Sequence, residues 1–446
     1  MRAKNLTLLC LTALLIVCLI VPSAFAATVP LEQTMSARYS VRGWSSTNIP
    51  ALQLLQVLQS AYGYAEGHRN VPRVGNSYSL DLFVANATAT YRYNPDTNTL
   101  TVHTPAVNKL TLRPRFSQNY LSDANAIIII VWDQTKMGNQ YYACAEAGLV
   151  VQNTYLAAVS IDLGTVCVAM IDSNGIRSDL SLASTMAPLL VMPLGYPTTP
   201  YQSVTPDYSR MLGNLPTVKI GTASFANTLN NLLYAQTWSN ENISAQELSQ
   251  LLWASYGYSS TGHRTVPSAL SVYPFKIWFL NSTGSYEYTP QSHSVTLKVS
   301  GDKRSQVANV FGTQNWASNA PTTFLIVYDS SLGGEGGVVT HEWSEVDAGT
   351  IAENILLEGA AWGVSGNIVS SSLEQWNGSG STSIRSLLDM PSSLILLFAV
   401  PVGHGGAIPE FPTSLALFAL LAATALIVAL FLASRRRIQY TFPAIF

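Results

Sequence analysis

The sequence predicts an α+β fold in which one domain occurs twice and a transmembrane helix follows the second copy. Three observations support this: an internal repeat, an alternation of helical and strand patterns within each copy, and an uncharged apolar segment near each end. The 446 residues suffice for two or three ordinary domains. Only 11% of the residues are charged, against about 25% in typical domains, and 48% are hydrophobic, which excludes an intrinsically disordered chain.

The N-terminus has the pattern of a secretory signal peptide. Arg2 and Lys4 precede an apolar stretch at residues 6–21, and small residues at 23–26 supply a cleavage site after Ala26. Because the stretch is long for a signal peptide, an uncleaved N-terminal anchor is the alternative. Residues 1–26 are therefore predicted to direct export of the domains that follow.

The C-terminus has the pattern of a membrane anchor. Residues 414–434 carry no charge and are long enough to span a hydrocarbon core of about 30 Å as a helix. Three arginines follow at once, and basic residues favour the cytoplasmic side. We therefore expect a single-pass protein of the cell membrane, with residues 435–446 in the cytoplasm and the domains outside. A buried core helix is the alternative.

The juxtamembrane segment, residues 406–413, contains Pro-Glu-Phe-Pro just before this helix. This motif, followed by an apolar helix and an arginine cluster, resembles the C-terminal sorting signal of the archaeal PEF type. The resemblance implies that a sortase-like enzyme processes the tail, and a plain anchoring helix is the alternative.

The region between the two ends is mildly acidic. It carries 18 basic and 25 acidic residues, a net charge of −7, without a cluster of lysines or arginines. This balance argues against nucleic acid as a partner, so the lipid membrane is expected to be contacted through the C-terminal helix alone. Cys144 and Cys167 either form a disulfide or remain free thiols, because nothing in the sequence fixes their geometry.

The repeat divides the region into two similar domains. Trp44-Ser45 recurs as Trp238-Ser239, and further matches extend the repeat along both copies; they pair residues 67–72 with 262–267, 91–95 with 286–290, and 147–153 with 348–354. We therefore expect domains at residues 27–200 and 225–405. A Pro-, Thr- and Ser-rich segment within residues 197–216 indicates a linker, placed at 201–224.

Each copy shows the same order of helical and strand patterns. Leucines at helical spacing around residues 54–58 and 248–252 predict helices that end at Gly63 and Gly257. Short apolar runs predict buried strands, at residues 127–131 and 324–327. Longer patterns predict helices at 148–163 and 349–364, and strands at 165–171 and 189–193 in the first copy.

Four motifs in this order resemble the nitroreductase family, in particular its SagB-type dehydrogenase branch. Residues 38–44 (Arg-Tyr-Ser-Val-Arg-Gly-Trp) resemble the family's opening segment, and residues 264–269 with Tyr273-Pro274 resemble its Arg-Thr-x-Pro-Ser-Ala segment. Residues 148–164 resemble its long central helix, and residues 194–197 resemble the end of its last strand. The resemblance covers roughly residues 30–200 and 225–405.

The resemblance implies an FMN-dependent fold that dimerises and binds the flavin at the dimer interface. Guanidinium and hydroxyl groups suit a phosphate, so Arg38, Ser40 and Arg42 are the expected phosphate ligands. The Pro267-Ser268-Ala269 segment would contact the flavin from the other side of the interface. Further candidate cations, expected to contribute less, are Arg69, Arg264 and Arg210.

In a tandem duplication the two halves can form an intrachain pseudo-dimer. The counterparts of Arg38, Ser40 and Arg42 are Leu232, Tyr234 and Gln236, while the counterpart of the Pro-Ser-Ala segment is Pro-Arg-Val at residues 72–74. One composite site therefore keeps both of its parts and the other has lost both. We expect a single FMN per chain.

Flavin chemistry needs no catalytic side chain, and none is predicted. His341 and Glu342 lack a second histidine at helical spacing, so a solvated loop is expected there rather than a metal site. His68 and His263 are expected to make structural hydrogen bonds. The sequence thus predicts a membrane-anchored, extracytoplasmic oxidoreductase acting on an unidentified small molecule or peptide. The alternative is a non-catalytic surface module, for binding or structure, built on a degenerate copy of the same fold.

Overall fold

The computed structural model describes residues 29–333, 340–369 and 379–405. The predicted signal peptide and membrane anchor lie outside the described residues. Within the described part of the chain, no helix has both the length and the apolar character needed to cross a membrane. The two predicted domains belong to one compact unit that ends at Gly406.

The first half is built on a six-stranded antiparallel sheet with the order β5-β4-β3-β6-β8-β7. Its strands are β3 (Leu80–Ala85), β4 (Thr90–Asn94), β5 (Thr99–Thr104), β6 (Ala126–Asp133), β7 (Gly164–Thr165) and β8 (Met186–Gly195), next to a small hairpin of β1 (Tyr64–Ala65) and β2 (His68–Arg69). Its helices are α2 (Leu31–Ala37), α3 (Ala51–Tyr62), α4 (Gln140–Ser160) and α5 (Ser173–Asp179), with 3-10 turns at Arg113–Arg115 and Asn119–Asp123.

The second half repeats this plan, with the strand order β11-β10-β9-β12-β14-β13. Its strands are β9 (Phe275–Asn281), β10 (Gly284–Thr289), β11 (Ser294–Ser300), β12 (Thr322–Asp329), β13 (Ser365–Gly366) and β14 (Leu394–Gly403). Its helices are α6 (Phe225–Asn230), α7 (Ala245–Tyr256), α8 (Arg304–Val310), α9 (His341–Ala361) and α10 (Ser379–Leu387), with 3-10 turns at Tyr208–Arg210, Ala269–Ser271 and Gly312–Asn319. The matching strand orders confirm the prediction of two tandem α+β domains.

Even the irregularities of the two sheets correspond. The central strand of each sheet contains a register shift, between Ile130 and Val131 in β6 and between Ile326 and Val327 in β12. Both strands are buried almost throughout because helices or loops cover both faces of each sheet. The apolar runs at residues 127–131 and 324–327 therefore marked real strands, which the structure extends by a few residues.

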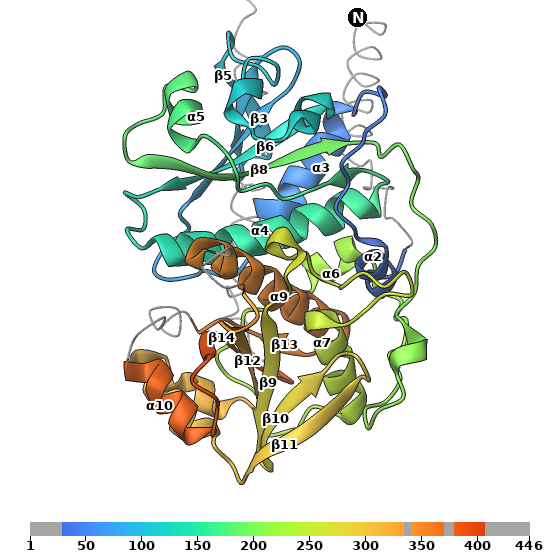
Figure 1. Ribbon diagram of the computed structural model, residues 1–446, viewed down its shortest axis with the longest axis vertical. Helices are drawn as coiled ribbons and strands as arrows, with labels where there is room; N and C mark the ends of the chain where they lie inside the picture. The colour runs from blue at the N-terminus through green and yellow to red at the C-terminus, as the bar shows by residue number, and fades with distance from the viewer. Residues whose placement is uncertain (1–28, 334–339, 370–378, 406–446) are drawn as a thin grey trace, which may run out of the picture. The chain divides into compact units, whose positions relative to one another are not determined.

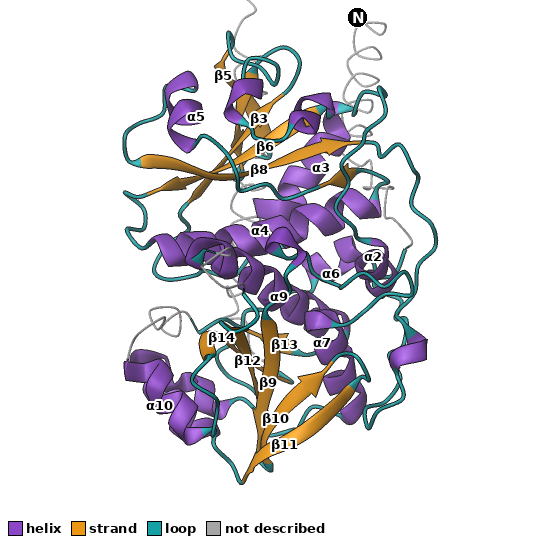
Figure 2. Ribbon diagram, in the orientation of Figure 1, coloured by secondary structure: helices purple, strands orange, loops and turns teal. Residues whose placement is uncertain are grey.

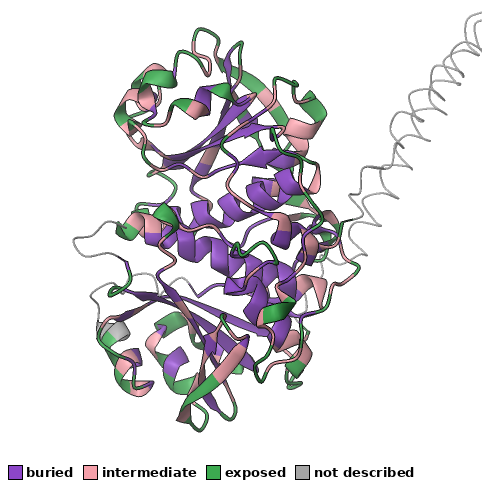
Figure 3. Cartoon of the chain, turned by 45° about the vertical axis from the view of Figure 1, so that its right-hand side comes forward, coloured by how far each residue is buried: buried purple, intermediate pink, exposed green. Residues whose placement is uncertain are grey.

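The long helices α4 and α9 lie side by side between the two sheets (Figures 1 and 2). Both are buried along most of their length (Figure 3), so they lack the polar face of a surface helix. The sequence placed their starts at Gly148 and Gly349, whereas they begin eight residues earlier. The side chains of Asn139 and Thr340 accept hydrogen bonds from backbone N–H groups of the first turn and so cap the helices there.

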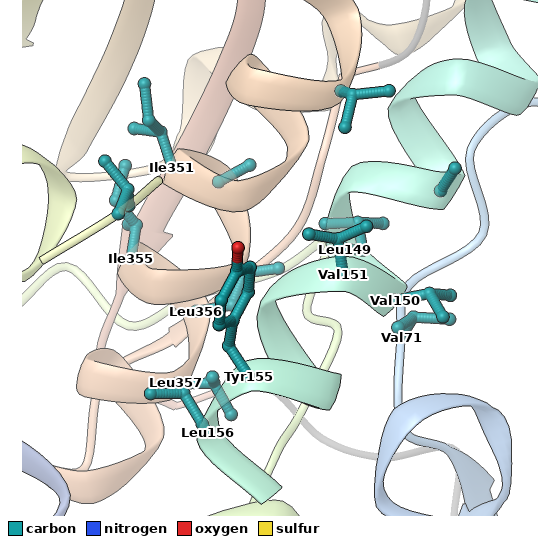
Figure 4. Packing of buried hydrophobic residues seen from close by; sticks show 14 of the residues in the cluster. Val71, Leu149, Val150, Val151, Tyr155, Leu156, Ile351, Ile355, Leu356 and Leu357 are labelled. Atoms are coloured by element: carbon teal, nitrogen blue, oxygen red, sulfur yellow. The ribbon is translucent and has the colours of Figure 1, made fainter. Parts of the chain in front are cut away.

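Gly148 and Gly349 lie where the two helices cross. A Cβ atom on Gly148 would lie 2.1 Å from the carbonyl oxygen of Val346, and one on Gly349 would lie 2.3 Å from that of Ala145. The backbones therefore approach more closely than any other residue allows. Apolar side chains of both helices pack around the crossing (Figure 4), so the halves share one core.

Residues at the start of each half pack on the other half. Helix α2 contacts both α6 and α9, and α6 contacts α4. The backbone N–H of Leu31 donates to the carbonyl of Ala223, and Trp362 Nε1 donates to Glu32 Oε1 at 3.0 Å. This exchange has the form of an intertwined dimer made within one chain.

The strand expected at residues 165–171 is shorter than predicted. Only β7 and an isolated bridge from Val168 to Val191 pair with the sheet. The intervening residues leave the sheet edge because they form one wall of the cavity described next.

Candidate functional site

A cavity opens between the two halves at one end of α4 and α9. Its enclosed volume is about 190 Å³. A single buried water needs only ~10–15 Å³ of such space, so the cavity has room for a group of many atoms. Its lining comes from both halves: Ser40, Arg42, Gln118, Tyr120, Val151, Tyr155 and residues 166–170 of the first, and residues 267–271, Tyr273, Trp343, Val346, Asp347 and Thr350 of the second.

The opening segment of the first half contributes Ser40 and Arg42. The Ser40 hydroxyl lies 3.2 Å from the hydroxyl of Tyr155, which accepts a hydrogen bond from the backbone N–H of Cys167 at 2.9 Å. Burial raises the pKa of Tyr155 to about 12, so its hydroxyl stays protonated. Arg42 is exposed, and its guanidinium donates to the carbonyl of Ser40 at 3.2 Å. Both side chains are thus available to a ligand.

Arg38 is a buried cation without an anionic partner. Its side chain lies behind the cavity wall, 5.2 Å above the ring of Tyr155, and the residue is only 2% exposed. Its Nη2 donates to the carbonyls of Arg264 and Val266, while Nε and Nη1 make no hydrogen bond. In the described part of the chain, no carboxylate forms an ion pair with Arg38 or Arg42. A surface ion pair therefore does not explain these arginines.

The second half supplies a strained loop held by a carboxylate. Asp347 accepts hydrogen bonds from the Ser268 hydroxyl at 2.8 Å and from the Ala269 N–H at 2.8 Å. The Ser268 oxygen in turn accepts from the N–H of Tyr273 at 3.0 Å. Leu270 adopts a φ of +52°, and Ser271 and Tyr273 are also left-handed. Such strain persists where surrounding bonds enforce it, and it is typical of ligand-binding loops.

Asp347 is fully enclosed yet borders the cavity. Burial raises the pKa of its carboxyl to about 7, against the lowering effect of the bonds from Ala269 and Ser268. Among the cavity-lining residues it is the one acidic side chain. The sequence reasoning missed it. The repeat offered a signal for it. Asp347 precedes Ala348-Gly349 as Glu146 precedes Ala147-Gly148, so both copies have an acidic residue at this position.

The repeat counterparts of these site segments, residues 232–236 and 72–74, carry different side chains. Leu232 and Val74 are buried apolar side chains, and Tyr234, the counterpart of Ser40, packs edge-on against His68 with ring centroids 6.2 Å apart. Arg73, in place of the family serine, lies over the ring of Tyr78. The structure thus brings Ser40 and Arg42 together with Pro267, Ser268 and Ala269 in one cavity, whereas Leu232, Tyr234 and Arg73 stand at the twin location.

Three candidate arginines lie elsewhere. The guanidinium of Arg264 donates to the carbonyl of Tyr256 and lies between tyrosine rings, and Arg69 occupies the matching cage in the first half. Arg210 pairs with Asp207 at 2.8 Å. None of these side chains lines the cavity, because each holds a local turn instead. The expectation that Arg264 contributes directly to the site is therefore corrected: only its carbonyl takes part, through Arg38.

The remaining candidates also have defined places. His68 Nε2 contacts the carbonyl of Leu229 at 3.1 Å, a structural hydrogen bond as expected. His341 begins α9, so the expected loop is wrong at this residue. Cys144 and Cys167 are free thiols. Within the described ranges, no group of three potential ligands could hold a metal ion.

Known proteins resemble this chain in sequence and in fold. A sequence model of the Nitroreductase family matches residues 35–196 and again residues 236–404. A Methanocaldococcus jannaschii protein named as a nitroreductase is 29% identical over 182 residues, which span 37% of this chain and 91% of that protein. A crystal structure named as a nitroreductase from Anabaena variabilis, 13% identical, covers 84% of this chain and 91% of its own with a TM-score of 0.65, which shows the shared fold. The chain therefore belongs to the nitroreductase family, with the family domain present twice in one polypeptide.

Proposed function

We propose that the protein is an FMN-dependent oxidoreductase with one flavin site, formed by the first half's opening segment and the second half's Pro-Ser-Ala loop. The observation that carries the proposal is the cavity between the halves, which Ser40 and Arg42 line from the first half and Pro267, Ser268 and Ala269 line from the second. A phosphate in the cavity would form charge-assisted hydrogen bonds with Arg42 and Ser40, while the buried guanidinium of Arg38 lies behind the cavity wall and contributes through its positive charge. The residues present therefore fit the phosphate end of FMN.

The rest of the cavity suits a flat, largely apolar ring with polar edges. Val151, Val166 and Val346 give apolar walls from both halves. Gln118 also lines the cavity, and its buried Oε1 has no hydrogen-bond donor, so it offers an acceptor to a ring N–H. When bound, the flavin would supply hydride chemistry, and the protein groups would hold, orient and shield it.

The stoichiometry follows from the difference between the halves. Leu232 and Tyr234 offer neither a cation nor an open hydroxyl in place of Arg38 and Ser40. Val74 and Arg73 likewise replace the small residues of the Pro-Ser-Ala loop. One flavin per chain is therefore proposed, held by an intrachain pseudo-dimer.

The proposals on the family branch and on the cellular location are supported by sequence motifs. The Arg-Thr-x-Pro-Ser-Ala motif with Tyr273-Pro274 supports the SagB-type branch, and the terminal segments 1–26 and 414–434 support an exported, membrane-anchored protein with a cytoplasmic tail. Fractionation of cells and protease treatment of intact cells test the location. The domains should stay with the membrane and be cleaved from outside; recovery in the soluble fraction would contradict this part of the proposal.

Flavin titration of the purified full chain tests the function. We expect a yellow protein that binds one FMN per chain, with quenching of flavin fluorescence. Arg42→Ala should weaken binding about 10- to 100-fold, because a hydrogen bond to a charged group contributes ~1.5–3 kcal/mol. Arg38→Ala should weaken binding by less, because Arg38 does not line the cavity and acts only through its charge. Arg73→Ala is the matched control, since it removes an exposed arginine from the twin location and should leave binding unchanged. Two flavins per chain would refute the single site, and a protein that stays colourless with FMN would favour the non-catalytic surface module.

A further inference from the structure

Because the domain occurs twice, each residue of α9 can be compared with its counterpart in α4, and one carboxyl group, that of Asp347, differs from its counterpart in its surroundings. Helices α4 and α9 are both 21 residues long, and their glycines, asparagines and carboxyls match at a constant offset. Glu146 in α4 and Asp347 in α9 are therefore twins. Both are buried, yet only Asp347 borders the cavity.

Glu146 is fully used as a structural acceptor. Its oxygens accept hydrogen bonds from the hydroxyls of Tyr62 and Ser79 and from the backbone N–H of Ser79 at 2.9 Å. Both oxygens are satisfied by residues that hold α3 and β3 against α4. Burial raises the pKa of Glu146, but no ligand can reach it in this arrangement.

Asp347, unlike Glu146, borders the cavity together with one of its hydrogen-bond partners. One of its partners, Ser268, also lines the cavity, and the Ser268 oxygen already accepts from the N–H of Tyr273. A hydroxyl has one donor and two acceptor positions. When Asp347 is a carboxylate, the Ser268 proton is directed to it. When Asp347 carries a proton, it can donate to Ser268, whose own proton is then free to point into the cavity.

We propose that Asp347, acting through the Ser268 hydroxyl, is the group that takes up and delivers a proton in the composite cavity. This inference rests on the proposed flavin site. Asp347 would take one proton from solvent when an external hydride donor has reduced a bound flavin by transferring a hydride to it. It then gives this proton to Ser268, and Ser268 passes its own hydroxyl proton to the acceptor that receives the hydride. The acceptor gains a hydride and a proton, and Asp347 returns to the carboxylate.

The surroundings of Asp347 support a proton exchange near neutrality. The ionisable groups that interact with it are Cys167 beyond β7, Tyr256 of α7 and Tyr328 of β12. Burial raises the pKa of all three, so they are neutral at pH 7. A negative charge added to the cavity raises the pKa of Asp347 further, because like charges disfavour ionisation. Reduction of a bound flavin should therefore be accompanied by proton uptake at Asp347.

The test is the pH dependence of the midpoint potential of FMN bound to the full chain. From pH 7 to 9, one extra proton per two electrons makes the potential fall more steeply by about 30 mV per pH unit. We expect this extra slope in the wild-type protein and its loss in Asp347→Asn. Glu146→Gln, the matched change at the twin position, should keep the wild-type slope. Equal slopes in the wild-type and Asp347→Asn proteins, with FMN bound to both, would overturn the inference alone.

A second measurement needs no variant and covers the case in which Asp347→Asn does not fold. Infrared difference spectra of the wild-type holoprotein at pH 8 should show the carbonyl stretch of a newly protonated carboxyl on reduction, with a shift in D₂O. Absence of that band would refute proton uptake at Asp347. Failure of the wild-type chain to bind FMN at all would instead refute the proposed function, and the inference with it.

Discussion

Glu353 is a buried carboxyl whose twin is an amide, and this difference leads to a sharp prediction. Gln152, its counterpart in α4, donates from Nε2 to Asn354 Oδ1 at 2.7 Å. By the same symmetry Glu353 lies beside Asn153, but neither carboxylate oxygen nor Asn153 Oδ1 has a hydrogen-bond partner. An ionised carboxylate and an amide oxygen are both acceptors, so these two groups form a hydrogen bond only when Glu353 carries a proton. We predict that Glu353→Gln stabilises the protein by restoring the bond that its twin makes.

The magnitude follows from the unsatisfied atoms. A buried acceptor left without a donor costs about 1–3 kcal/mol, and a hydrogen bond contributes about 1 kcal/mol net. We therefore expect a gain of about 1–3 kcal/mol in the free energy of unfolding at pH 8. Burial raises the pKa of Glu353 well above its ordinary value. A protonated Glu353 can itself donate to Asn153, so the gain should shrink toward acid pH.

The sign of the pH dependence is fixed by this pKa. Because the folded protein holds the Glu353 proton more tightly than the unfolded chain, its contribution is complete below the unfolded pKa of about 4.3 and is lost as the pH rises toward the folded value. Glu353→Gln removes this loss. The difference between variant and wild type should therefore grow from pH 5 to pH 8.

Urea unfolding of the full chain at both pH values, followed by tryptophan fluorescence, measures this difference. Gln152→Glu is the mirror control: it places a carboxylate opposite Asn354 Oδ1 and should destabilise the protein most at pH 8. The other buried carboxyls are unchanged in both variants, so their contributions cancel. A Glu353→Gln protein that is less stable at pH 8, or a difference that does not grow with pH, would refute the reasoning.

Three further predictions concern the core and the cavity. Gly148→Ala should lower the free energy of unfolding by about 1–3 kcal/mol or more and so lower the urea midpoint, because its Cβ would meet the carbonyl of Val346; an unchanged midpoint would contradict the close crossing. Tyr155→Phe leaves the N–H of Cys167 without its acceptor and should cost about 1–3 kcal/mol of stability, read from the same unfolding curves; a neutral effect would show that this bond is dispensable. Alkylation followed by mass spectrometry should label Cys167 slowly and only without FMN, while Cys144 stays unlabelled throughout, since burial raises the pKa of both thiols; labelling of Cys167 at the same rate with FMN would contradict its place in the site.

Much of the architecture could be predicted because it depends on local patterns repeated in both halves. The apolar runs of β6 and β12 mark central strands, since only residues buried on both faces are apolar without interruption. The long helices were also predicted, but their starts were not. Gly148 and Gly349 look like helix boundaries, whereas their real role is a close contact between two helices distant in sequence. Only the packing reveals that role.

In the candidate site, too, some residues could be predicted from sequence motifs and others are recognised only from their contacts in the structure. Ser40, Arg42 and the Pro-Ser-Ala loop could be named from motifs, and the structure brings them to one cavity. Asp347 was missed: the repeat matches it to Glu146, but only the structure shows which neighbours its carboxyl meets. Arg264, named as a weaker candidate, does not line this cavity but lies among tyrosine rings, since a sequence cannot tell whether a guanidinium points into a cavity or into a cage of tyrosines.

The asymmetry between the halves explains why a single polypeptide with two copies can retain one site and lose the other. In a homodimer every residue serves both sites, so neither site can change alone. In this chain the proposed site combines Arg38 with the neutral Gln152, whereas the twin location combines Leu232 with Glu353, near the partly buried Tyr234. A cation has thus become apolar and an amide has become an acid, and both changes disfavour a phosphate. Glu353→Gln should consequently stabilise the fold without creating a second flavin site, because the missing cation and the open hydroxyl would still be absent.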